Sequence, residues 1–307
     1  MIPYTRKTLP NGLTVVVNRD RASKLAAVNI LYRVGARNEN PARTGFAHLF
    51  EHLMFRGTRA VENFDLPVQM ASGDNNAFTN NDYTDFYITL PKDNLETALW
   101  LESDRMEGLD ITPAKLEAEK KVVIEEFRQR YLNQPYGDQT MLLRALAYKV
   151  HPYRWAAIGL ATDHIAGATL ADVESFYRAH YRPSNAILSI SADMEEEWML
   201  ELAEKWFAPL ADHPSETAAI PQEPVQTQAR RQEVERDVPA STVTVAYHMC
   251  ARTKPDFYTA DLVSDLLSGG DSGRLYTHLV KERNLLSSVN AYITGDVDPG
   301  LFVFTGQ

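Results

Sequence analysis

The chain has 307 residues, of which 44% are hydrophobic and 23% are charged, a balance typical of a globular protein with enough length for two domains. Its formal net charge of -10 at pH 7 opposes binding to nucleic acid or to an anionic membrane surface. No apolar run is long enough to cross a bilayer, and the single cysteine, Cys250, excludes an internal disulfide framework.

The N-terminal segment leads directly into predicted strands. Residues 13–17 and 27–34 are rich in β-branched and apolar side chains, which favours strands. The segment before them lacks the apolar core of a signal peptide. If Met1 is the native start, we expect a cytoplasmic protein; a periplasmic location would require a leader that has been removed.

A helix with two histidines is predicted next. Thr44 can cap its N-terminus, apolar residues then recur with helical spacing, and Gly57 can end it. Residues 48–52 read HLFEH, so His48 and His52 lie four apart on one face of the helix, with Glu51 beside them. Two imidazoles can bind one metal ion and the adjacent carboxylate can act as a base, so this segment predicts a zinc site.

A third metal ligand is expected because catalytic zinc usually takes three protein ligands. Thr112 followed by Pro113 is typical of a helix start, and the helical pattern continues to residue 127. Glu119 and Glu126 lie seven residues apart on one face of this helix. The adjacent Glu125 is turned away by about 100°. We therefore choose Glu126 as the third ligand.

Further strands and a domain boundary are predicted on either side of this helix. Residues 72–79 begin with turn formers and lead into a β-branched and aromatic run at 83–90, which indicates a strand pair. A strand at 186–191 belongs to the same antiparallel α+β domain, predicted to span residues 1–210. Residues 211–240 are predicted to be a linker that runs into the first strand of a second domain, because they are rich in Gln and charge and contain Pro214, Pro221, Pro224 and Pro239.

Residues 241–307 resemble a partial copy of the first domain. A shift of 215 residues aligns five identical pairs without a gap: Val28 with Val243, Tyr32 with Tyr247, Ala36 with Ala251, Arg37 with Arg252 and Thr44 with Thr259. At the same offset the metal triplet falls on Val263, Leu266 and Leu267. We predict a metal-free copy that packs apolar residues there. A copy of equal length would extend beyond Gln307, so the second copy looks incomplete and we expect the chain alone to be inactive.

Several strings, in the correct order, resemble the pitrilysin and insulinase-like zinc metallopeptidases, whose zinc motif is inverted. They are the HLFEH string, the VVIEE string at 122–126 and the segments 9–15, 35–37, 45–48, 76–79, 102–106, 151–153, 158–159 and 181–183. The resemblance runs nearly end to end, and within the family the chain is similar to bacterial processing-peptidase-like members. It implies duplicated antiparallel-sheet-plus-helices domains that form half of a metallopeptidase clamshell, with the second copy truncated here.

The resemblance also implies roles for individual residues. His48, His52 and Glu126 would bind one zinc ion per chain. Glu51 would be the general base for a water activated by that ion, and Glu119 a second carboxylate that supports the site. The implied activity is that of a zinc endopeptidase acting on oligopeptides or unfolded segments.

Substrate binding and assembly are implied in the same way. In the resembled family, the segment that contains Asn76 and Ala77 belongs to an edge strand that receives an extended peptide by main-chain pairing. Relatives use both halves around the peptide, so a homodimer or a heterodimer with a related subunit is expected. No nucleic-acid or membrane partner is expected.

Other classes of function fit part of the sequence. The first is a non-catalytic scaffold or partner subunit of a heteromeric peptidase, although such members usually lack part of the triplet that is intact here. The second is a structural zinc module with a closed four-ligand site and no room for water. The same ligands accept manganese or cobalt. No arrangement of Ser, His and Asp supports nucleophilic catalysis.

Overall fold

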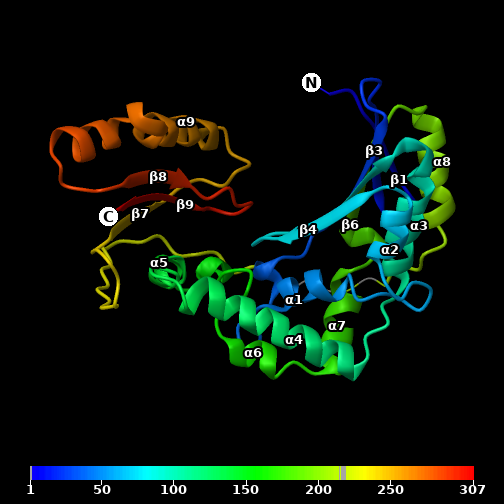
Figure 1. Cartoon of the computed structure of the whole chain (residues 1–307), viewed down its shortest axis with the longest axis horizontal. Helices are drawn as coiled ribbons and strands as arrows, with labels where there is room; N and C mark the ends of the chain where they lie inside the picture. Colours follow the sequence, from blue (N-terminus) through cyan, green and yellow to red (C-terminus); the bar gives the residue numbers. More distant parts are fainter. Residues whose placement is uncertain (1, 214, 216–218) are drawn as a thin grey trace. The chain divides into compact units, whose positions relative to one another are not determined.

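The structure is a computed structural model that describes residues 2–213, 215 and 219–307, and these residues form two compact units (Figure 1). The first unit comprises the chain up to Phe127 together with Trp155–Pro221. The second unit comprises Arg128–Arg154 together with Gln222–Gln307. The second unit thus takes a segment from inside the predicted domain 1–210. The boundaries at 210 and 240 were predicted from the composition of the segment between them, and they stay a prediction. Pro214 lies outside the described residues.

The first unit is built on a six-stranded sheet with the order β1-β2-β6-β3-β5-β4. Neighbouring strands are antiparallel except β2 and β6, which are parallel. The antiparallel α+β prediction is therefore confirmed apart from this one pair, in which β6 arrives from a distant part of the chain. The strands are β1 (Thr5–Thr8), β2 (Thr14–Arg19), β3 (Leu25–Tyr32), β4 (Asp74–Thr79), β5 (Thr84–Pro91) and β6 (Ala186–Ala192).

Helices cover one face of this sheet. Val28, Ile30 and Ile88 point toward that face and are fully buried, which contributes about 1.5–3 kcal/mol for each side chain. Asn29 is half-buried on the opposite face and Tyr87 is exposed there, as alternation along a strand requires. α3 and α8 pack on β2, β3 and β5, while α1 packs on β4 and β5. The helices are α1 (Phe46–Leu53), α2 (Asp65–Met70), α3 (Leu95–Glu107), α4 (Pro113–Phe127), α6 (Thr162–Ala166), α7 (Leu170–His180) and α8 (Glu196–Phe207).

Short helical turns connect the longer elements of both units. The turns are η1 (Ala36–Asn38), η2 (Lys92–Asn94), η3 (Arg128–Leu132), η4 (Pro152–Arg154), η5 (Pro183–Asn185), η6 (Gly270–Ser272) and η7 (Tyr276–Glu282).

None of the helices in the described ranges combines the length and the apolar character needed to span a bilayer.

The core of the first unit contains a buried ion pair on α3. Arg105 Nε donates to Glu102 Oε2 over 2.7 Å, and both side chains are at most 1% exposed. The guanidinium group also lies 4.3 and 4.2 Å from the ring centres of Phe64 and Phe86. Burial raises the pKa of Glu102, and the charge and hydrogen bonds of Arg105 oppose that shift. The carboxylate is therefore stable in the core only while Arg105 is present.

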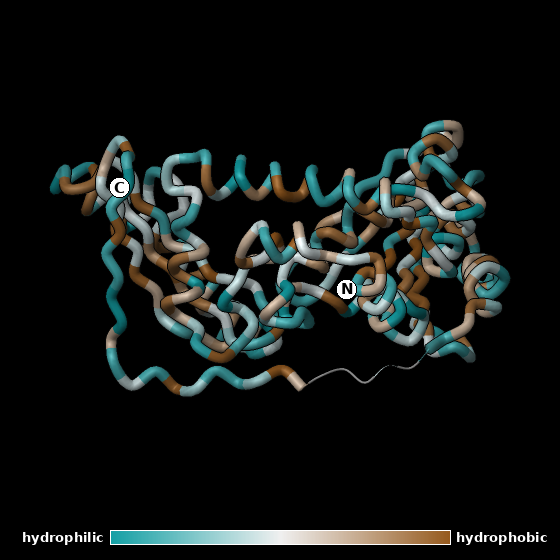
Figure 2. The backbone as a smooth tube through the Cα atoms, turned by 90° about the horizontal axis from the view of Figure 1, so that it is seen from below, coloured by the Kyte–Doolittle hydropathy of each residue, from teal (hydrophilic) through white to brown (hydrophobic). Residues whose placement is uncertain are grey.

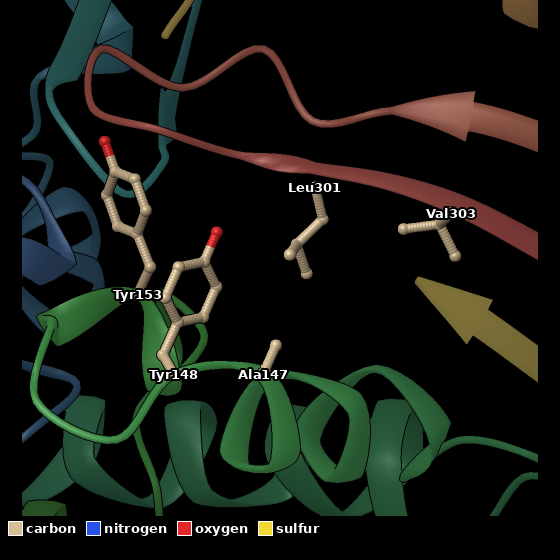
Figure 3. Close-up of a cluster of buried hydrophobic side chains, with 5 residues drawn as sticks. All are labelled: Ala147, Tyr148, Tyr153, Leu301 and Val303. Carbon is tan, nitrogen blue, oxygen red and sulfur yellow. The ribbon is translucent and has the colours of Figure 1, made fainter. Parts of the chain in front are cut away.

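The second unit contains a three-stranded antiparallel sheet with the order β7-β9-β8, formed by β7 (Val243–His248), β8 (Val289–Ile293) and β9 (Leu301–Gly306). α9 (Asp256–Ser268) lies on one face and α5 (Gln139–Ala147) on the other (Figure 1). The residues between α5 and the sheet form a buried cluster of Ala147, Tyr148, Tyr153, Leu301 and Val303 (Figure 3). This cluster is what places α5 in the second unit.

Residues 222–240, predicted as part of a linker, are extended and mostly hydrophilic (Figure 2), and they are bonded to the ends of α5. The carboxylate of Glu223 accepts the backbone N–H groups of residues 149, 150 and 151 over 2.8–2.9 Å. Arg230 donates to the carbonyl oxygens of Leu146 and Ala147. A cation is favourable there because the C-terminus of a helix carries partial negative charge. Arg236 pairs with Asp138, just before the helix begins. The segment therefore stabilises α5 rather than running free.

The two sheets repeat one arrangement. β7, α9, β8 and β9 follow one another as β3, α1, β4 and β5 do, and the spatial orders β7-β9-β8 and β3-β5-β4 agree. The 215-residue offset moves β4 to 289–294 and β5 to 299–306, which overlap β8 and β9. The predicted duplication of the fold is confirmed.

The prediction that apolar residues of the copy pack at the metal positions was wrong at two of the three positions; the third, Leu267, is half-buried. Val263 and Leu266, which stand at the positions of His48 and Glu51, are 41% and 51% exposed instead of packed. The reason is the different surroundings of the two helices: α1 packs against α4 and α7, whereas within the described residues α9 packs mainly on β8.

Candidate metal centre

The helix that carries the histidines begins differently from the prediction. α1 starts at Phe46 after Gly45, and Thr44 does not cap it; the Thr44 hydroxyl instead accepts the N–H of Leu160 over 2.8 Å. The N-terminus is capped by Glu39, whose two carboxylate oxygens accept the N–H groups of Gly45 and Ala47 over 2.9 and 2.8 Å. A buried carboxylate thus fixes the end of α1 next to the first histidine.

Gly45 is required at this helix start by its conformation. Its φ of +91° lies in the left-handed region, and an added Cβ would stand 2.6 Å from the carbonyl oxygen of Ile158. Gly45→Ala is expected to lower the free energy of unfolding by about 1–3 kcal/mol because of this strain. Urea denaturation measures the effect. Gly108→Ala is the matched control, since nothing lies within 4 Å of its Cβ position; equal losses in the two variants would contradict the argument.

The second helix of the site begins as predicted. The N–H of Lys115 donates to Thr112 Oγ1 over 3.2 Å, and α4 starts at Pro113. Along α4, Glu119 is 1% exposed and Glu126 is half-buried, whereas Glu125 is exposed. α4 packs against α1, so Glu119 and Glu126 both reach the histidines.

The structure brings together the three predicted metal ligands. Glu126 Oε2 lies 3.4 Å from His52 Nε2 and 3.7 Å from His48 Nε2, and the three ligand atoms lie within 4.8 Å of one another. In a tetrahedral zinc site with bonds of about 2.0–2.1 Å, two ligand atoms stand roughly 3.3 Å apart. Within the described residues this is the only group of three or more such side chains with metal-ligand spacing. The donor set and its spacing fit zinc.

Glu119 lies beside His52. Its Oε2 is 3.4 Å from His52 Nδ1, and its Oε1 contacts the guanidinium group of Arg56. Burial alone would raise the pKa of Glu119, but the bonds to His52 and Arg56 outweigh burial and lower it. An ionised Glu119 makes Nδ1 of His52 the N–H donor, which leaves Nε2 for a metal. Sequence reasoning missed Arg56, although its i+4 spacing from His52 could have indicated it.

The two carboxylates also control the protonation of His52. Burial disfavours the charged imidazole, but hydrogen bonds and charge from Glu119 and Glu126 outweigh it and raise the pKa of His52 to about 9. Zinc must displace that proton, so below pH 9 zinc affinity is expected to fall about tenfold for each pH unit. Competition with a chromophoric chelator at pH 6, 7 and 8, corrected for the chelator's own protonation, measures the slope. A flat profile would contradict this expectation.

Glu51 lines a cavity beside the metal ligands. This cavity has a volume of about 990 Å³, and His52, Glu119, Phe55 and Trp100 also line it. Glu51 is half-buried, one residue before His52 on α1. A carboxylate at the wall of an open cavity next to a metal centre has room for a water molecule and a peptide group beside it. The position agrees with the predicted base, and the role stays a prediction.

Asn76 and Ala77 lie on β4, at the edge of the six-stranded sheet. They pair with Tyr87 and Phe86 of β5, and among the described residues no strand pairs with their other side. The predicted strand pair is confirmed, and α1 packs against β4, so this edge runs next to the histidine-bearing helix. An edge strand has main-chain groups available for a further strand. The predicted role of these two residues in substrate binding is untested.

Two family models match the chain. The model described as Insulinase (Peptidase family M16) matches residues 14–156, and the model described as Peptidase M16 inactive domain matches residues 167–307. The chain is 34% identical over 303 residues to the zinc protease PqqE of Helicobacter pylori, covering 97% of this chain and 68% of that protein. It is 26% identical over 315 residues to a probable mitochondrial-processing peptidase subunit beta of Arabidopsis thaliana, covering 98% of this chain and 59% of that protein.

A solved structure agrees with these relatives. The crystal structure of a protease from Helicobacter pylori matches with a TM-score of 0.92 and 33% identity, covering all of this chain and 75% of that one. The fold of two repeated α+β units is therefore that of a peptidase half. The chain belongs to the M16, or insulinase, family of peptidases.

Proposed function

We propose that the protein is a zinc-dependent endopeptidase that hydrolyses peptide bonds in oligopeptides or unfolded segments. The observation that carries the proposal is the convergence of His48, His52 and Glu126, with ligand atoms within 4.8 Å of one another, beside Glu51 at the wall of a cavity. When bound, zinc would act as a Lewis acid that polarises the scissile carbonyl group and makes a water molecule more acidic. The names of the H. pylori and other zinc-protease relatives support this assignment.

The residues of the chain would divide the remaining work. Glu51 accepts a proton from the attacking water and delivers it to the leaving amine, which is general acid-base catalysis by one positioned carboxyl group. Glu119 holds His52 with its Nε2 facing the ligand set. The outer edge of β4 at Asn76 and Ala77 pairs with the extended substrate through main-chain hydrogen bonds, and the Ala77 N–H gives up its 2.8 Å bond to Asn76 Oδ1 to do so. Affinity would therefore depend little on sequence.

Metal content together with cleavage of a quenched peptide library tests this proposal. We expect about one zinc per chain and cleavage that disappears in Glu51→Gln. The assay is run on the chain alone and after mixing with candidate related subunits from the same organism. Zinc binding without cleavage in either case would contradict the proposal.

A non-catalytic or partner-dependent role is the second candidate. The model that matches residues 167–307 is described as an inactive domain, and one relative is named as a subunit of a processing peptidase. We propose that the chain assembles with a second copy of itself or with a related subunit. We also propose that the protein is located in the cytoplasm. Light scattering after size exclusion, with and without the candidate subunit, tests the assembly; a monomer under all conditions would contradict it.

A further inference from the structure

The cavity beside Glu51 has lining residues that the proposed chemistry does not use. They include Glu62 and Asp65, two exposed carboxylates from the loop before α2 and the first residue of α2. All lining residues belong to the first unit. In the proposed mechanism Glu51 gives its proton to the leaving amine, so the residue that carries this amine has its side chain next to the cavity.

Part of the cavity wall is apolar and aromatic. Phe55, Val61, Leu66 and Trp100 line it. Phe55 is held by edge-to-face packing on Phe64, with ring centres 5.7 Å apart. Such a wall favours a long aliphatic stem, and the face of an aromatic ring also attracts a cation at its end.

The charged groups of the lining do not cancel. Arg56 contacts Glu119, and Lys115 Nζ lies 2.9 Å from Asp110 Oδ2, so both cations of the lining already have a carboxylate. In the described part of the chain, no salt bridge joins Glu62 or Asp65 to a cation. Asp65 accepts one hydrogen bond, from the Asn75 amide, which leaves its charge in place. The wall formed by Glu62 and Asp65 is therefore negative.

We propose that Glu62 and Asp65 make this cavity a subsite for a lysine or arginine side chain on the residue that follows the scissile bond. The methylene stem packs on Phe55 and Trp100, and the cation meets the two carboxylates. An acidic side chain at the same position is repelled, and a neutral one of equal length gains only the apolar contact. This inference rests on the proposed peptidase function and adds its substrate preference.

Peptides that differ only in the residue after the scissile bond test the inference. Lysine is compared with methionine, which has similar length without charge, and with glutamate; mass spectrometry locates the bond that is cut. We expect kcat/KM to favour lysine over methionine by about tenfold or more, equivalent to about 1.4 kcal/mol. Glu62→Gln with Asp65→Asn is expected to bring this ratio near one, and Glu62→Lys to shift preference toward glutamate. Glu201→Gln, an exposed carboxylate on α8, is the control and should leave the ratio unchanged.

Binding separates this inference from the proposed function. The same peptides are titrated, by fluorescence anisotropy, into the zinc-loaded Glu51→Gln variant, with and without the Glu62→Gln substitution. Cleavage that depends on Glu51 with a lysine-to-methionine ratio near one would overturn the subsite and leave the peptidase standing. Lysine-selective binding that Glu62→Gln removes, without cleavage by the wild type, would support the subsite and overturn the peptidase. Neither cleavage nor selective binding would overturn both.

Discussion

Glu51→Gln is expected to lower kcat/KM for peptide hydrolysis by about 100- to 10,000-fold, the usual contribution of a general acid-base group, while the zinc content stays the same. Glutamine keeps the size of the side chain but cannot accept and return a proton. Zinc content is preserved because the predicted ligands are His48, His52 and Glu126, whose ligand atoms converge without Glu51. Steady-state kinetics and metal analysis on the same preparation measure both quantities.

Glu125→Gln provides the matched control for this prediction. Glu125 is exposed on α4 beside the proposed ligand Glu126, so the variant removes the same charge nearby and is expected to keep both activity and zinc. Glu126→Gln should lose zinc and activity together. If Glu51→Gln also lost its zinc, Glu51 would be a ligand or a structural residue and its assignment as the base would be wrong.

Arg105→Met is expected to lower the free energy of unfolding by about 3–5 kcal/mol, because it leaves Glu102 charged and without its partner in the core. Glu102 is fully buried and its carboxylate is paired with Arg105 over 2.7 Å. Urea denaturation at pH 8 measures the loss. Arg178→Met, on the exposed side of α7, is the control and should change stability little.

The pH dependence and a double variant identify the cause of this loss. Burial raises the pKa of Glu102 above its unfolded value, and removal of the opposing charge and hydrogen bonds of Arg105 would raise it further. The loss in Arg105→Met should therefore shrink as the pH falls and Glu102 takes up a proton, and grow as the pH rises. Glu102→Leu combined with Arg105→Met should recover most of the stability. A loss that is independent of pH and persists in the double variant would mean that the packing of Arg105 on Phe64 and Phe86 matters more than the charge.

Local sequence signals predicted the parts of the site that depend on helix geometry. The spacing of His48 and His52 places both imidazoles on one face of any helix, and Thr112 with Pro113 marks where α4 begins. The phase of Glu126 against Glu125 then follows from the helical period alone. These expectations needed no knowledge of the neighbours, and the geometry of α1 and α4 agrees with them.

Features that depend on distant contacts were not predicted. Glu39 caps α1 from a preceding loop, and no local pattern distinguishes it from the closer candidate Thr44. The packing of α5 on β9 was not predicted either, because the two segments are far apart in the sequence. The parallel pairing of β2 with β6 and the exposure of Leu266 likewise depend on which segments lie alongside, which is a property of the folded chain.

The interleaved composition of the second unit has a consequence for synthesis on the ribosome. α5 leaves the exit tunnel well before Leu301 and Val303, the strand residues that cover Ala147 and Tyr148. At translation rates of about 5–20 residues per second, the apolar side of α5 waits on the order of 10 s for its partner strand. During that interval the apolar face of α5 is exposed on the nascent chain, after most of the first unit has been synthesised. We therefore expect chaperones to bind this stretch of the chain.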